Sequence, residues 1–138
     1  YNIYTIILEE EIMNYWTKKF SKLNKKYWNG DLTKIKVTVT NLLDTDRAEG
    51  LYIYPEYEED KDGNIYVSTP AKIYLERSLS HYKKINVLLH EMCHHAVEEY
   101  YEDRPYHDHG KWWKQEMVRC GFKGKITSTR GHYKTKNL

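Results

Sequence analysis

His90 and His94 lie four residues apart in an apolar stretch, residues 87–97, and this spacing constrains the fold more than any other sequence feature. On an α-helix, residues four apart project from one face, one turn apart, so both imidazoles would point toward a common point. Glu91 would lie about 100° further round the helix. In the pattern His-Glu-x-x-His, two histidines bind zinc and the glutamate is a general base. We therefore expect a helix with a zinc-binding edge.

The residues around this motif are consistent with a buried helix. At about 100° per residue, one continuous arc that would face a core contains Leu89, Met92, Cys93, Ala96 and Tyr100. The other side of the helix would carry Leu88, His95 and Glu99. The two motif histidines lie at the edge of the apolar arc, so the helix would be buried and would bind a metal along this edge.

The length of the chain predicts one domain with a single modest core. All 138 residues form this domain, with a core over about residues 9–122 and a basic tail over 123–138. The 14% of aromatic residues indicates an ordered globular protein. The opening stretch, residues 1–8, contains too few apolar residues to span a bilayer, so no membrane association is expected. The sequence leaves the oligomeric state open.

Two cysteines, Cys93 and Cys120, are too few for a disulfide framework or a four-cysteine zinc site. They are most simply buried thiols of an intracellular protein. The richness in Lys, Asn, Ile and Tyr is compatible with an A/T-rich genome, so we expect a cytoplasmic protein of a bacterium or of a phage-infected host cell.

Charge is unevenly distributed, although the formal net charge is only +2. Residues 18–36 carry seven Lys against one Asp, and residues 111–136 carry eight Lys or Arg against one Glu. Residues 44–62 carry eight acidic residues against two basic ones. The basic segments have two interpretations of equal weight: contact with DNA through the first helix and the tail, or solvated helix faces.

Apolar periodicity predicts the remaining elements. The spacing of Ile12, Trp16, Phe20, Leu23 and Tyr27 predicts a first helix over residues 9–29, ended by Asn29-Gly30. Strands are expected at residues 35–40, 51–54 and 65–68, in one small, mostly antiparallel sheet. Residues 70–78 fit either a strand or a turn of helix. The motif helix is expected over residues 82–101, and a last helix from about Gly110 has a core stripe of Trp113, Met117 and Cys120.

A catalytic zinc usually has three protein ligands and one open position. His95 would point away from the metal. Glu98 lies on the ligand side of the same helix, but three ligands from one straight helix cannot surround a tetrahedral ion well, so it would instead support a ligand. His109 follows a loop long enough to return to the motif, and Gly110 beside it permits close backbone approach. His107 is the alternative on the same loop.

Three segments together resemble the SprT-like zinc metallopeptidases, a family that includes the bacterial SprT proteins and the Spartan protease domain. Residues 23–32 resemble the family's helix end and turn before its first strand. Residues 89–94 resemble its active-site helix. Residues 109–113, His-Gly-Lys-Trp-Trp, are similar to its downstream element that carries the third zinc ligand. The three segments occur in the family's order, although the chain lacks the cysteine-rich zinc ribbon of many relatives.

The resemblance implies His90, His94 and His109 as ligands of one Zn²⁺ per chain, with Glu91 as the catalytic base. It also implies an α+β, zincin-like fold: an N-terminal helix on a small sheet, the motif helix, and a following helix that carries the third ligand. The implied activity is that of a zinc-dependent endopeptidase acting on a protein or peptide, with DNA-associated proteins as candidate substrates.

In this mechanism a zinc-activated water attacks the peptide carbonyl while Glu91 transfers its proton to the leaving amine. Candidate oxyanion donors are Tyr106, His107, His132 and Tyr133, and nothing in the sequence ranks them. The alternative function is a DNA-associated binding module that retains a non-catalytic zinc site.

Overall fold

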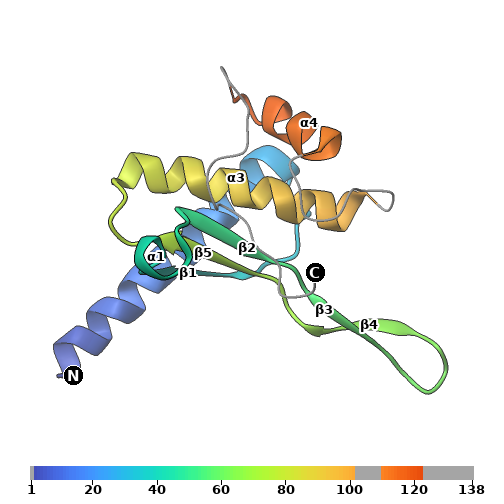
Figure 1. Cartoon of the computed structure of the whole chain (residues 1–138), viewed down its shortest axis with the longest axis horizontal. Helices are drawn as coiled ribbons and strands as arrows, with labels where there is room; N and C mark the ends of the chain where they lie inside the picture. The colour runs from blue at the N-terminus through green and yellow to red at the C-terminus, as the bar shows by residue number, and fades with distance from the viewer. Residues whose placement is uncertain (1, 102–109, 123–138) are drawn as a thin grey trace.

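The computed structural model describes residues 2–101 and 110–122. The elements, in chain order, are α1 (Ile3–Trp28), β1 (Lys36–Thr40), α2 (Leu43–Asp46), β2 (Gly50–Ile53), β3 (Glu56–Glu59), β4 (Ile65–Thr69), β5 (Lys72–Glu76), α3 (His81–Tyr100) and α4 (Lys111–Arg119). The protein is α+β, as predicted (Figure 1). No helix within the described ranges combines the length and the apolarity that crossing a bilayer requires.

The strands form two sheets where the sequence predicts one. The larger sheet has the order β1-β5-β2, with β1 parallel and β2 antiparallel to β5. The smaller sheet is the antiparallel hairpin β3–β4, which extends away from the larger sheet in Figure 1. The prediction of a single sheet is therefore wrong, because apolar alternation indicates a strand but not its partner. Residues 70–78, which the sequence left undecided, contain strand β5.

Strand β3 and the short helix α2 are absent from the sequence prediction. The β3 sequence, Glu-Tyr-Glu-Glu, has few strand-favouring residues, and its four side chains are all exposed. It becomes a strand because it pairs with β4 across the predicted turn, where Gly63 has a φ of +83°. There, the Asp60 carboxylate accepts hydrogen bonds from the backbone N–H groups of Asp62 and Asn64, both at 2.9 Å. Pairing between strands outweighs local propensity here.

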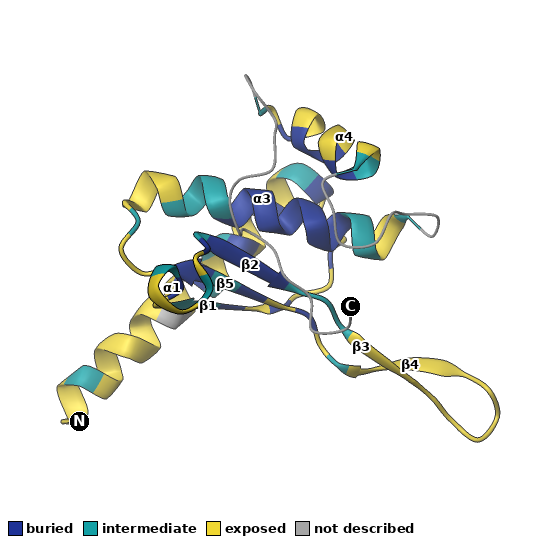
Figure 2. Ribbon diagram, viewed as in Figure 1, coloured by how far each residue is buried: buried dark blue, intermediate teal, exposed yellow. Residues whose placement is uncertain are grey.

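Helix α1 begins six residues before its predicted start. Asn2 caps it, accepting a hydrogen bond from the backbone N–H of Thr5 at 2.9 Å. The first half of the helix is largely exposed, as Figure 2 shows, so no buried stripe marks its start. Ile12, predicted to be buried, is 48% exposed. The predicted end is confirmed, since Asn29 adopts the left-handed conformation that commonly follows a helix.

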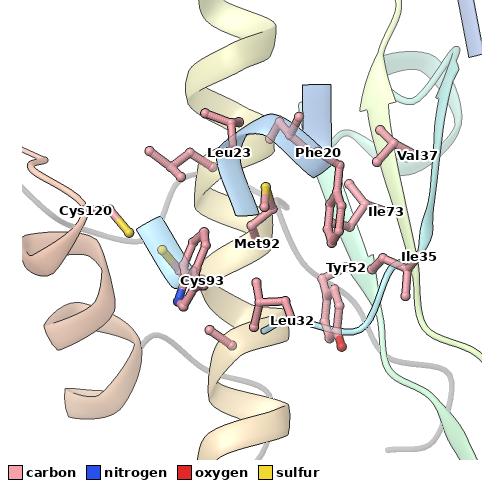
Figure 3. Close-up of a cluster of buried hydrophobic side chains, with 14 of the residues drawn as sticks. Phe20, Leu23, Leu32, Ile35, Val37, Tyr52, Ile73, Met92, Cys93 and Cys120 are labelled. Carbon is pink, nitrogen blue, oxygen red and sulfur yellow. The ribbon is translucent and has the colours of Figure 1, made fainter. Parts of the chain in front are cut away.

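The core lies between the larger sheet and helices α1 and α3 (Figure 3). Residues of three neighbouring strands share one sheet face, because Val37 of β1 and Tyr52 of β2 are both paired with Ile73 of β5. These three side chains, with Phe20 of α1 and Met92 of α3, are fully buried. Burial of each such side chain stabilises the fold by about 1.5–3 kcal/mol. This packing fixes α3 against the sheet.

Candidate metal centre

Helix α3 is capped by Ser80, whose hydroxyl accepts a hydrogen bond from the backbone N–H of Lys83 at 3.2 Å. Its bounds agree with the prediction to one residue. The predicted core residues Leu89, Met92, Cys93 and Ala96 are buried, whereas Tyr100 is 45% exposed. Leu88 and His95, expected on the outer side, are buried as well. The sheet, α1 and α4 all contact α3, so its buried surface is wider than one amphipathic arc.

The motif side chains converge as their helical spacing predicts. One candidate ligand atom from each of His90, Glu91 and His94 lies within 4.8 Å of the other two. The two imidazole rings are 5.6 Å apart between centroids. Glu91 and His94 are buried almost completely, and His90 is 9% exposed. Two nitrogen donors and a carboxylate therefore face a common, largely dehydrated point.

Two aromatic rings from other elements hold the histidines in place. Trp113 of α4 lies 4.6 Å from His90 and stacks on His94 at 5.5 Å, and its indole N–H donates to the carbonyl of His90 at 3.3 Å. Tyr52 of β2 is nearly parallel to His94, with 6.3 Å between ring centroids. Trp113 is almost fully buried, in agreement with its predicted core position. Strand β2 and helix α4 thus limit the rotation of the imidazoles.

Glu91 has an unusual environment for a carboxylate. Its side chain is fully buried, and neither oxygen has a hydrogen-bond partner among the described residues. Burial raises its pKa well above the ordinary value, because the charged form loses its hydration. Glu91 and His90 line a cavity of about 190 Å³ together with Glu49, Lys83, Asn86, Val87 and Phe122. The carboxylate therefore lies beside a space that a small polar group can enter.

The donor set fits a zinc ion. Imidazole nitrogens are common zinc ligands, and catalytic zinc sites leave a position for water. A buried carboxylate without a partner is costly, and a water beside the ion would satisfy it. The described residues supply two histidine ligands and this carboxylate.

A family model for the SprT-like family matches residues 16–132, which is most of the chain. The chain belongs to the SprT-like family. The family is one of zinc metallopeptidase-like proteins, in agreement with the resemblance seen in the sequence. No curated protein and no solved structure matches the chain.

The third ligand expected from this SprT-like resemblance, His109, lies outside the described residues. The same holds for the alternative ligand His107 and for three of the candidate oxyanion donors, Tyr106, His132 and Tyr133. Glu98, expected to support a ligand, accepts a hydrogen bond at 2.9 Å from the hydroxyl of Tyr57 in the hairpin. Its role at the metal stays a prediction.

His95 was expected on the side of α3 that faces away from the core, and that prediction is wrong. The side chain is buried, and Nε2 lies 2.8 Å from the carbonyl of Thr33 and 3.1 Å from the Glu99 carboxylate. Since a carbonyl only accepts, Nε2 carries the hydrogen, and in the neutral ring Nδ1 accepts from the Tyr52 hydroxyl at 2.8 Å. Sequence reasoning missed Tyr52 and Glu99 as supports of this site. The four-residue spacing of His95 and Glu99 places them on one helix face, and this spacing was a signal for the contact with Glu99.

Proposed function

We propose that this protein is a zinc-dependent endopeptidase with a zincin-like active site. In this proposal His90, His94 and His109 hold one zinc ion, and Glu91 is the general base. The observation that carries the proposal is the buried carboxylate of Glu91, which has no hydrogen-bond partner among the described residues and lies beside two converging imidazoles. A purely structural zinc site has no use for such a carboxylate, whereas a hydrolase needs one near the attacking water.

His109 is supported by the position of helix α4. Trp113 follows it by four residues and contacts both motif histidines, so α4 is anchored at the candidate metal centre. Gly110 begins this helix as its N-cap residue. We retain His109 as the third ligand on this ground, with His107 as the alternative.

In the proposed reaction, a bound zinc ion would polarise the peptide carbonyl and make a water molecule more acidic. Glu91 accepts the proton of that water as its oxygen attacks the carbonyl carbon. The carboxylic acid then protonates the amine as the C–N bond breaks, which restores the carboxylate.

Substitution of Glu91 by Gln tests the proposal. The amide cannot accept the proton, so we expect kcat for cleavage of an unstructured protein such as casein to fall by about 10²–10⁴-fold. The zinc content after native purification should stay at one ion per chain. Glu10→Gln makes the same chemical change at an exposed position of α1 and should leave kcat unchanged. Undiminished cleavage by the Glu91 variant would exclude the proposed role.

The alternative, a DNA-associated module with a non-catalytic zinc site, rests on the lysines of α1. Lys18, Lys22, Lys25 and Lys26 are all exposed, which suits either DNA contact or solvation. If they contact phosphates, reversal of three of them to Glu should weaken binding to duplex DNA and reduce the slope of log K against log[salt] by about 0.9 per lost contact. An unchanged affinity would remove DNA contact by α1. This result is independent of peptide cleavage.

The cellular location also stays a proposal. Cys93 and Cys120 are both buried and unpaired, and Figure 3 shows their sulfur atoms close to each other between α3 and α4. Buried cysteines that form no disulfide are usual in proteins of a reducing compartment, so we propose a cytoplasmic location.

A further inference from the structure

A second pocket lies away from the candidate metal centre, where α1, β1 and the start of α3 meet. It has a volume of about 310 Å³, within the usual range for small-molecule sites. Its lining consists of Ile12, Tyr15, Trp16, Val39, Arg77, His81 and Lys84. None of these residues lines the cavity beside Glu91, and His81 precedes His90 by nine residues, or about 13 Å along the helix axis.

Among the residues that the structure describes, the lining of the pocket includes basic side chains and no carboxylate. Arg77 is exposed, and its guanidinium has no ion-pair partner in the described part of the chain. The neighbouring carboxylate of Glu76 does not line this pocket, and its oxygens accept hydrogen bonds from the backbone N–H groups of Leu42, Leu43 and Ser78. Lys84 donates one hydrogen bond to the carbonyl of Leu79 at 2.6 Å, which orients its ammonium group and leaves two further donors.

One wall of the pocket is a cluster of three rings. Tyr15 and Trp16 are 5.1 Å apart between centroids, and His81 lies 5.6 Å and 5.4 Å from them. The hydroxyl of Tyr15 and Nε2 of His81 are within hydrogen-bond distance, at 3.2 Å. Trp16 is buried and supports the wall from behind, whereas Tyr15 is 44% exposed. An accessible aromatic surface therefore adjoins the basic residues.

We propose that this pocket binds a nucleoside phosphate, with the phosphate at Arg77 and Lys84 and the base against Tyr15 and His81. Guanidinium and ammonium groups are strong donors to phosphate oxygens. Stacking of a base on an aromatic side chain contributes about 1–3 kcal/mol and tolerates any base. Ile12 and Val39 supply the apolar contacts that a base or a sugar needs. The same chemistry is offered by a free mononucleotide and by one nucleotide of a single-stranded nucleic acid.

The binding of three probes to the zinc-loaded full chain tests this proposal by calorimetry. The probes are adenosine 5′-monophosphate, inorganic phosphate and a short oligothymidylate. We expect saturable binding of the mononucleotide, the oligonucleotide or both, and binding of inorganic phosphate at least tenfold weaker. Preference for the mononucleotide would identify a free nucleotide as the ligand, and preference for the oligonucleotide would identify a nucleic-acid strand. Absence of binding of both nucleotide probes would overturn the proposal.

Three variants in the pocket and one control variant outside it assign the binding to this pocket. Arg77→Gln should weaken nucleotide binding at least tenfold, and Arg77→Lys should restore part of it. Tyr15→Leu keeps apolar bulk but removes the ring, so a loss of roughly 5- to 100-fold is expected. Lys72→Gln removes an exposed cation of β5 that does not line the pocket and should have no effect. Thermal melting should be the same for all four variants. Binding that survives both Arg77→Gln and Tyr15→Leu would overturn the assignment.

Peptide cleavage is not measured in this experiment. The result therefore stands whether or not Glu91 acts as a general base, and a failure here leaves the proposed endopeptidase activity unaffected.

Discussion

At the scale of single residues, Gly50 controls the position of Glu91. It begins β2 directly against α3, and a Cβ atom at this position would lie 2.5 Å from Cγ1 of Val87 and 3.3 Å from Cγ of Glu91. The absence of a side chain lets the strand approach the helix at the point where the proposed base lies. The sequence motif thus depends on a glycine forty residues earlier.

The substitution Gly50→Ala should therefore disturb both stability and activity. We expect a loss of about 1–3 kcal/mol in the free energy of unfolding, measured with urea, because the new methyl group overpacks the contact. Peptide cleavage should fall as Glu91 is displaced. The double variant Gly50→Ala, Val87→Ala removes the clashing atom and should recover part of the stability lost by Gly50→Ala. Strictly additive losses would contradict this account.

At the scale of elements, His95 joins three segments of the fold. It belongs to α3, Tyr52 to β2 and Thr33 to the connection between α1 and β1, and all three meet at its two ring nitrogens. Glu99 strengthens the junction, since its carboxylate accepts a hydrogen bond from the backbone N–H of Thr33 at 2.6 Å. Burial alone would raise the pKa of Glu99, but its bonds to His95 and Thr33 outweigh that effect and lower it. Because Tyr52 also stacks on His94, this junction supports the candidate metal centre.

Tyr52→Phe tests the junction with minimal change of shape. Loss of the hydroxyl leaves Nδ1 of the buried His95 without its donor, so we expect a loss of about 1–3 kcal/mol in the free energy of unfolding. Tyr66→Phe removes an exposed hydroxyl that bonds to Glu58 in the hairpin, and its effect should stay below about 0.5 kcal/mol. Equal effects of the two substitutions in urea unfolding would show that the buried bond does not stabilise the fold.

At the scale of the whole molecule, Glu76 makes the free energy of unfolding depend on pH in the acid range. Burial would raise the pKa of this carboxyl, but hydrogen bonds from Ser78, Leu43 and Leu42 outweigh it and lower the pKa from 4.5 to about 2. A carboxyl group whose pKa is lower in the folded state than in the unfolded state stabilises the fold at pH values above its unfolded-state pKa. This contribution is therefore complete above pH 4.5 and is lost as the pH falls through about 2.

The comparison of Glu76→Gln with the unaltered protein isolates this contribution. Both oxygens of the Glu76 carboxylate accept hydrogen bonds, whereas the amide of Gln has only one acceptor oxygen. At pH 7 we therefore expect a loss of about 2–3 kcal/mol in the free energy of unfolding. The difference between the two proteins should decline as the pH is lowered from 4.5 to about 2. Glu58→Gln, at an exposed position of the hairpin, makes the same chemical change and should give only a small difference at pH 7. A constant difference for Glu76→Gln would contradict the assigned pKa.

Local pattern was sufficient for the long elements. The periodic apolar residues located α3, α4 and the second half of α1, since each of these segments buries a face against the core. The start of α1, which buries little, was missed for the same reason. Strand β3 was also missed, because its four exposed residues form a strand only through pairing with β4. The pairing of the strands could not be predicted. It depends on how the connections between strands reverse the chain, and the alternation of apolar and polar residues within a strand does not encode this.

The sequence by itself determined that His90, Glu91 and His94 lie on one helix and near one another, because helical geometry fixes residues three and four apart. It also determined the family, because three segments occur in the family's order. No single motif spacing could have identified the family. Only the tertiary structure decided that Glu91 is buried with no hydrogen-bond partner among the described residues, that Trp113 and Tyr52 enclose His94, and that His95 is a buried junction. These features arise from contacts between α3, β2 and α4. The periodicity of one helix carries no information about which elements cover its other faces.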